Sequence, residues 1–67
     1  MIDKLDLHGM RHSDVERVVE NFVLLNEPPL IIITGNSDYM RNAVKIVCKN
    51  HNIEYEMWDW GEIKILK

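Results

Sequence analysis

The sequence contains a single cysteine, Cys48, and this scarcity excludes two classes of small protein. An intrachain disulfide needs two cysteines and a cysteine-rich metal site needs several, so neither stabilises this chain. Cys48 lies in a run with helical spacing, which favours a core or half-buried position over a reactive one. A chain without disulfides suits a reducing compartment, and we expect a cytoplasmic protein.

Long apolar runs are also missing. The longest runs, such as residues 30–33, cover four residues, far short of the roughly 20 that cross a bilayer. The first residues lack the basic and then apolar pattern of a signal peptide. We therefore expect no membrane segment. The 67 residues suffice for one domain, 1–67, which buries roughly 60% of its unfolded surface, and we expect a monomer.

Positive charge is not in excess. Eight Lys and Arg residues face eleven Asp and Glu residues, and the net charge of −3 argues against strong non-specific affinity for nucleic acids. The basic residues are nevertheless grouped: Arg41, Lys45 and Lys49 recur every four residues and form one stripe on a helix. The simplest interpretation of this stripe is a solvated helix face.

Apolar spacing predicts the element order β-α-β-α-β-β. The expected strands cover residues 3–7, 30–34, 53–58 and 62–66, and the expected helices cover residues 13–25 and 37–50. Ser13, with Glu16 three residues later, has the pattern of a capping box for the first helix. The residues predicted to turn its apolar face to the sheet are Val15, Val18, Val19, Phe22 and Leu25. In the second helix, capped by Asn36 or Ser37, the corresponding residues are Met40, Ala43, Val44 and Val47.

This order predicts a two-layer α/β sandwich with a four-stranded mixed sheet. Strand-helix-strand units favour right-handed parallel crossovers, and we expect both helices on one face of the sheet. The unbroken apolar run 30–33 suits an interior strand, and a turn at residues 59–61 joins the last two strands into a hairpin. The residues expected in the core are Val18, Phe22, Ile32, Val44 and Val47.

Polar residues follow the first two predicted strands. Alternation along a strand places Asp6 and His8 on the same side, and Gly9 then allows a sharp turn. The second strand runs into a loop over residues 34–37, Thr-Gly-Asn-Ser. Because parallel neighbouring strands end at the same sheet edge, we expect these two loops to lie side by side and to form a site.

The chemistry of these loops suits a phosphodiester. The imidazole of His8 exchanges protons near neutral pH, and Asp6 would orient it; alternatively, both residues only satisfy loop backbone groups. Residues 35–37 offer N–H groups and a helix N-terminus to a phosphate, although an ordinary helix cap at Ser37 explains them equally. No cluster of His, Asp and Glu has the spacing of a metal site, but Asp6 with His8 could hold Mg²⁺ or Mn²⁺ weakly.

Two motifs resemble those of the Smr (small MutS-related) domain family. The first is the Leu-Asp-Leu-His-Gly sequence of residues 5–9, which is complete. The second is the family's TGxG loop, which is half present, since Thr34 and Gly35 match but Ser37 replaces the second glycine. Arg41, after Met40, fits the family's leucine-arginine pair. The resemblance covers nearly the whole chain.

The resemblance implies a fold like the C-terminal domain of translation initiation factor three. It also implies nucleic-acid binding and, in several members, endonuclease activity on DNA or RNA. Asp6 and His8 would then be the catalytic residues. The residues expected to contact nucleic acid are Gly9, Arg11, His12, Thr34, Gly35, Asn36, Ser37, Arg41 and Lys45. The alternatives are a nucleic-acid-binding module without chemistry and an adaptor that docks on a protein.

Several residues keep two interpretations. Arg11 and His12 either contact phosphates or are solvated loop residues. Trp58 and Trp60 flank the predicted hairpin turn, where they either stack on unpaired bases or close the edge of the core. His51 ends a helix, where a cation is favourable, and we expect it to be structural.

Overall fold

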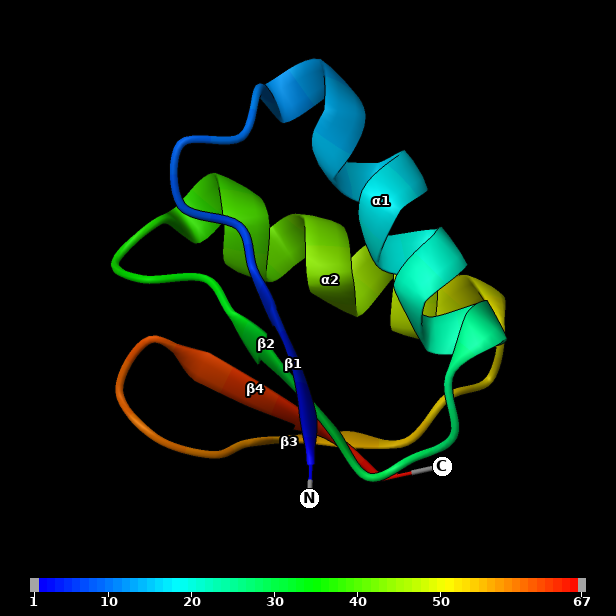
Figure 1. Cartoon of the computed structure of the whole chain (residues 1–67). Coiled ribbons are helices and arrows are strands. Elements are labelled where there is room, and N and C mark those ends of the chain that lie inside the picture. Colours follow the sequence, from blue (N-terminus) through cyan, green and yellow to red (C-terminus); the bar gives the residue numbers. More distant parts are fainter. Residues whose placement is uncertain (1, 67) are drawn as a thin grey trace.

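A computed structural model describes residues 2–66 of the chain (Figure 1). The elements follow the predicted order β-α-β-α-β-β. The strands are β1 (Asp3–Asp6), β2 (Leu30–Ile33), β3 (Tyr55–Met57) and β4 (Glu62–Ile65), and the helices are α1 (His12–Leu25) and α2 (Asp38–Asn50). No helix within residues 2–66 has the length and apolarity that a bilayer crossing requires.

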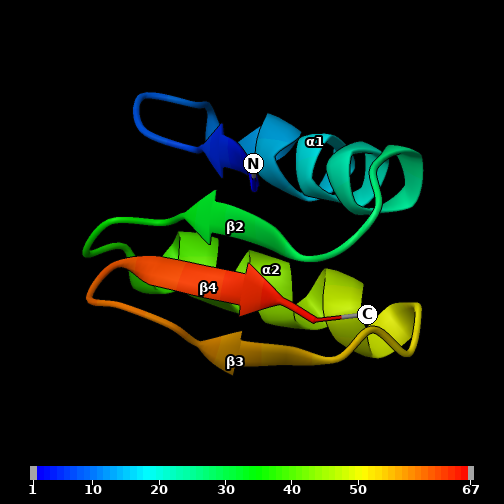
Figure 2. The ribbon, with the colours of Figure 1, turned by 60° about the horizontal axis from the view of Figure 1, so that its bottom comes forward.

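The four strands form one mixed sheet in the order β1-β2-β4-β3. β2 pairs parallel with β1 and antiparallel with β4, and β3 pairs antiparallel with β4 as the second arm of a hairpin. Both helices lie on the same face of this sheet (Figure 2). The predicted two-layer α/β sandwich, the interior position of β2 and the terminal hairpin are therefore confirmed.

The core lies between the helices and the two central strands. Leu30 and Ile32 of β2 and Ile63 of β4 are fully buried on the helix side. The predicted apolar face of α2 is buried throughout, and Ile32, Val44 and Val47 are core residues as expected. Cys48 is also fully buried, and burial raises the pKa of its thiol to about 11. The prediction of a core cysteine is thus confirmed.

The predicted start of α1 is wrong. The helix begins at His12, its N-cap is Arg11, and no side chain caps it, so the capping box of Ser13 and Glu16 is not formed. Contacts from α2 hold this first turn instead. The Tyr39 ring stacks on the His12 ring at 3.9 Å between centroids, and the Tyr39 hydroxyl donates a hydrogen bond to the His12 carbonyl oxygen.

The buried face of α1 is also rotated from the prediction. Val15 and Val19 are buried as expected, Phe22 is partly buried against the core, and Val23 is buried although it was not predicted. Leu25, in contrast, is 80% exposed, and Val18 is only partly buried. Each helical residue turns by roughly 100°, so Val18 and Leu25 lie on the opposite side of Val15 from Val23.

The hairpin differs from the prediction in its length and exposure. β3 covers only Tyr55–Met57, and all of its residues are exposed because it is an edge strand. Trp58 and Trp60 are 52% and 76% exposed, which excludes the core-packing interpretation for both. The Lys64 ammonium nitrogen instead lies over the Trp58 ring, 4.0 Å from the centroid of that ring.

Candidate functional site

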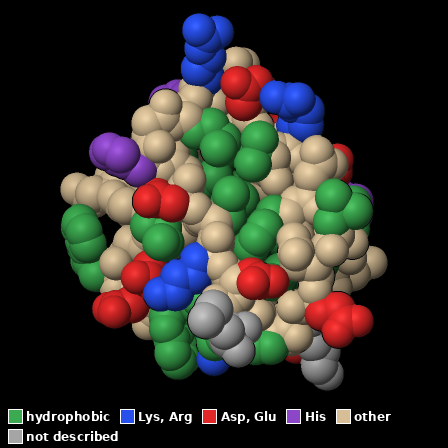
Figure 3. Space-filling model, viewed as in Figure 1, with side chains coloured by type: hydrophobic (Ala, Val, Ile, Leu, Met, Phe, Trp, Pro, Cys, Tyr) green, Lys and Arg blue, Asp and Glu red, His purple; other side chains and the backbone are tan. Residues whose placement is uncertain are grey.

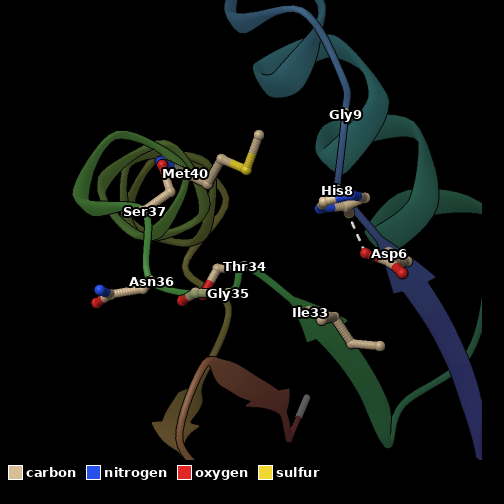
Figure 4. A pocket seen from close by; sticks show the side chains of 9 residues that line it. All are labelled: Asp6, His8, Gly9, Ile33, Thr34, Gly35, Asn36, Ser37 and Met40. Atoms are coloured by element: carbon tan, nitrogen blue, oxygen red, sulfur yellow. Dashed lines mark hydrogen bonds between the residues drawn. The ribbon is translucent and has the colours of Figure 1, made fainter.

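An open cavity of about 490 Å³ lies where β1 and β2 end. Its walls come from the loop after β1 on one side and from the β2–α2 loop on the other (Figure 4). The residues that line it are Asp6, His8, Gly9, Ile33, Thr34, Gly35, Asn36, Ser37 and Met40. The prediction that the two loops lie side by side is confirmed.

The loop after β1 is shaped by Asp6. Its carboxylate oxygen Oδ1 accepts a hydrogen bond from the backbone N–H of His8 at 2.9 Å. The Met10 N–H donates to the Leu7 carbonyl oxygen at 3.1 Å, which closes a tight turn, and Gly9 supplies the positive φ of 76° that this turn requires. Asp6 therefore holds the backbone that presents His8, whose side chain borders the cavity opposite the start of α2 (Figure 4).

The β2–α2 loop is held from a distant part of the sequence. The backbone N–H groups of Thr34 and Gly35 both donate to the carbonyl oxygen of Gly61, at 2.8 and 3.0 Å. The Thr34 side chain is buried, and its hydroxyl lies 3.2 Å from the same Gly61 oxygen. Thr34 and the Gly35 N–H are thus engaged in structural contacts, and they do not offer donors to the cavity.

The start of α2 leaves donors for a ligand. The Ser37 hydroxyl caps the helix by accepting a hydrogen bond from the Met40 N–H at 3.2 Å, as the sequence predicts. Among residues 2–66, none accepts a hydrogen bond from the backbone N–H of Asn36 or Ser37. The first N–H groups of a helix also lack intrahelical acceptors, and the helix dipole favours an anion there.

Arg41 stabilises the β2–α2 loop from outside the cavity. Its guanidinium donates a hydrogen bond to the Gly35 carbonyl oxygen at 3.1 Å and pairs with the Asp38 carboxylate. It does not line the cavity. Arg41 was predicted to contact a phosphate. In the structure its guanidinium has a structural role, because two protein acceptors already engage its charge.

Three other predicted contact residues lie outside the cavity. Arg11 is the exposed N-cap residue of α1. His12 is stacked on Tyr39, and Lys45 lines a different groove beside β3. His51, expected to be structural, has its Nε2 2.8 Å from the Glu20 carboxylate and so links the end of α2 to α1. The site therefore gathers seven of the predicted residues: Asp6, His8, Gly9, Thr34, Gly35, Asn36 and Ser37.

Acidic and basic side chains are mixed on one face of the molecule (Figure 3). On the face shown in Figure 3, acidic and basic side chains are interspersed around a central group of hydrophobic ones. Within the described part of the chain, no three His, Cys, Asp or Glu residues are gathered as a metal ligand set. Asp6 and His8 would thus supply at most part of the coordination of Mg²⁺ or Mn²⁺, and the remaining ligands would be water or phosphate oxygens.

Two residues that shape the site were not predicted from the sequence. Met40 was assigned to the core, but its side chain also forms part of the cavity wall (Figure 4). Gly61 was interpreted only as a turn residue, yet its carbonyl oxygen holds the β2–α2 loop. No sequence signal connects Gly61 to Gly35, because the contact depends on the strand order β2-β4.

Comparison with solved structures identifies the architecture. The solution structure of the SMR domain of NEDD4-binding protein 2 superposes with a TM-score of 0.64 over 98% of this chain and 85% of that chain. The chain has the fold of an Smr domain. Sequence identity is 22%, so this likeness concerns the Smr fold and not the details of the site. No protein-family model matches the sequence, and no curated protein matches it.

Proposed function

We propose that this Smr-like domain binds nucleic acid, with a backbone phosphate held in the cavity between His8 and the start of α2. One observation carries the proposal. His8 borders the same 490 Å³ cavity as Asn36 and Ser37, whose N–H groups have no acceptor among residues 2–66, at the carboxyl ends of two parallel strands. That edge of an α/β sheet is where ligands generally bind, and a helix N-terminus suits a phosphate.

The phosphate would lie against the backbone rather than against Lys or Arg side chains. Arg41 is engaged by Gly35 and Asp38, and Lys45 lies elsewhere. Binding of this kind releases few counterions, so its affinity would fall gently with salt. The net charge of −3 agrees with a module that does not bind duplex nucleic acid through a broad basic surface.

Cleavage of the phosphodiester is the finer part of the proposal. His8 is exposed at the cavity, where its imidazole would take a proton from water or from a ribose 2′-hydroxyl, or give one to the leaving oxygen. Asp6 would act as a positioning residue, because its carboxylate fixes the His8 backbone. The helix N-terminus would stabilise charge that develops on the phosphate oxygens.

Trp60 favours a single-stranded substrate. It is 76% exposed and precedes Gly61, the residue that holds the cavity loop. An unpaired base stacked on such a ring gains roughly 1–3 kcal/mol, whereas a base within a duplex is already stacked. Trp58 is less suited to this role, because the Lys64 ammonium group covers its ring.

A matched pair of variants at the helix cap tests the phosphate site. Asp and Asn cap a helix as well as Ser does, so Ser37→Asp and Ser37→Asn should both fold. Only Ser37→Asp places a negative charge beside the phosphate. We expect it to weaken the binding of labelled single-stranded DNA and RNA by roughly tenfold or more, measured by fluorescence anisotropy at low salt, and Ser37→Asn to stay near the wild type.

A second pair tests the chemistry. Cleavage of single-stranded, duplex and branched DNA and RNA would be followed with and without Mg²⁺ or Mn²⁺. We expect His8→Ala to abolish cleavage with affinity within a few-fold of the wild type, and His12→Ala to retain it, since His12 is stacked outside the cavity. Binding without cleavage would identify a module without chemistry. Undetectable binding at low salt would overturn both nucleic-acid functions in favour of protein docking.

A further inference from the structure

A second groove runs along the edge of the sheet, between α2 and β3. It has a volume of about 640 Å³, within the range of pockets that hold ligands. It shares no residue with the His8 cavity. The residues that line it are Asn42, Lys45, Ile46, Lys49 and Tyr55.

The floor of this groove is apolar and accessible. Ile46 of α2 is 47% exposed, and Tyr55 of β3 is 36% exposed. Tyr55 pairs with Ile65 across the hairpin, and Ile65 belongs to the core between sheet and helices. Residues directly opposite one another share a face, so Tyr55 lies on the helix side of the sheet, as does Met57 opposite Ile63.

Among residues 2–66, no strand pairs with the outer edge of β3. The Trp58 N–H donates to the Glu62 carbonyl oxygen, and the Leu66 N–H donates to the Glu54 carbonyl oxygen, at 3.1 and 2.8 Å. In an antiparallel pair, residues that bond to the partner strand alternate with residues whose N–H and C=O point away. Tyr55 and Met57 therefore direct their backbone donors and acceptors to the open edge.

We propose that an extended segment of a partner protein binds here as a further strand on β3, with alternate side chains in the groove below α2. Such strand addition combines main-chain hydrogen bonds with side-chain pockets. Tyr55 and Met57 supply the main-chain groups. Ile46 and Tyr55 form the apolar contact for an inward side chain, and Lys45 and Lys49 attract carboxylates beside it.

Charge complementarity defines the bound sequence. Inward positions of the segment carry an aliphatic residue next to Asp or Glu, opposite Lys45 and Lys49. Outward positions lie beside Glu54 and Glu56, which occupy the other face of the edge, so acidic residues are unfavourable there. The ligand is thus a strand with acidic and aliphatic residues on one face and neutral or basic residues on the other.

Two other occupants suit this edge less well than a peptide. A second copy of this chain, paired antiparallel through β3, would place Glu54 and Glu56 of one copy beside those of the other. A single-stranded nucleic acid in the groove would leave the N–H and C=O groups of β3 without strand partners. A peptide satisfies both the backbone and the lysines.

Peptide selection tests the proposal with the full chain. A library of random decapeptides displayed on phage would be panned against the wild type and against the double variant Lys45→Glu/Lys49→Glu. Both substitutions lie on the helix surface, and heteronuclear NMR spectra would verify that the variant is folded. We expect the wild type to enrich peptides with alternating acidic and aliphatic residues, and the variant to bind these peptides at least tenfold more weakly.

NMR titration with the best synthetic peptide then locates the site. We expect the largest amide shifts at Tyr55 and Met57, new protection of these amides from exchange, and at least tenfold loss of affinity when the peptide backbone is N-methylated at alternate positions. No enrichment of acidic-aliphatic peptides, or shifts confined to the His8 cavity, would overturn the proposal. So would concentration-dependent self-association through β3, or oligothymidylate binding that shifts Lys45 and Lys49.

Discussion

Gly35 and Gly61 touch backbone to backbone, although they lie 26 positions apart in the sequence. A Cβ atom placed on Gly61 would lie 3.1 Å from the Gly35 Cα and 3.2 Å from its carbonyl oxygen. Both residues also have a positive φ, 61° for Gly35 and 75° for Gly61. The hairpin turn thus supports the cavity loop directly, with no room for a side chain between them.

The first prediction compares two glycines. Gly61→Ala and Gly9→Ala both force a positive φ on alanine, which costs roughly 1–2 kcal/mol. Only Gly61→Ala adds a contact with the Gly35 backbone, since nothing lies within 4 Å of a Cβ on Gly9. We expect Gly61→Ala to lower the free energy of unfolding by about 1 kcal/mol more than Gly9→Ala. Urea denaturation measures both, and equal losses would contradict the close contact.

The second prediction concerns Arg41. Because its guanidinium engages Gly35 and Asp38, Arg41→Ala should lower the free energy of unfolding by about 1–2 kcal/mol and leave the salt dependence of nucleic-acid binding unchanged. Arg41→Lys should recover only part of this stability, because lysine lacks the planar fork. A salt slope that falls by about one ion, with stability unchanged, would instead show a direct phosphate contact.

A third prediction follows from the buried thiol of Cys48. Burial raises its pKa in the folded chain to about 11, above the ordinary value of 9.0, so the folded state binds this proton more tightly than the unfolded state. The resulting stability is present below pH 9 and is lost as the pH rises toward 11. As the pH rises from 9 to 11, we expect the free energy of unfolding of the wild type to fall by up to about 3 kcal/mol more than that of Cys48→Ala.

Chemical denaturation at several pH values measures this difference. The wild-type curve also contains the titration of tyrosines and lysines, which the Cys48→Ala chain retains, so subtraction isolates the thiol. Parallel curves for the two chains would contradict the prediction. Thiol reagents should also react slowly with Cys48 at pH 8, at a rate limited by unfolding.

The fourth prediction concerns the contact that replaces the helix cap of α1. His12 and Tyr39 stack with ring planes 8° apart. A double-mutant cycle with His12→Ala and Tyr39→Ala should give a coupling free energy of about 0.5–1.5 kcal/mol. Tyr39→Phe keeps the stack and loses only the hydrogen bond to the His12 carbonyl oxygen, so it should cost less than Tyr39→Ala. Additive single losses would show that the stack contributes nothing.

Local signals in the sequence predicted most of the fold. Alternation and helical spacing gave the element order, and Ser37 was identified as a helix cap from its own side chain. The capping box at Ser13 failed because a tertiary contact, the Tyr39 stack, fixed the helix start one residue earlier. The prediction for Leu25 failed because the buried face of α1 is rotated toward Val23, which leaves Leu25 exposed.

The residues of the candidate site that lie at strand ends were predicted from the sequence. The contacts that depend on the order of the strands were not. The meeting of His8 with Ser37 follows from two parallel neighbours, which the strand-helix-strand pattern implies. The roles of Gly61 and Arg41 depend on which groups the fold brings near Gly35. The sequence shows that an arginine can donate hydrogen bonds. It does not show whether a carbonyl oxygen of the protein already accepts them.

The hold of Gly61 on the β2–α2 loop has a consequence for biosynthesis. Every residue that lines the His8 cavity lies between positions 6 and 40, yet the acceptor for the Thr34 and Gly35 N–H groups stands at position 61. During synthesis from the N-terminus, the complete lining is made before β4 is made. The cavity would take its final shape only when the hairpin docks beside β2, so the domain would acquire its ligand site after synthesis has passed this hairpin, and not progressively.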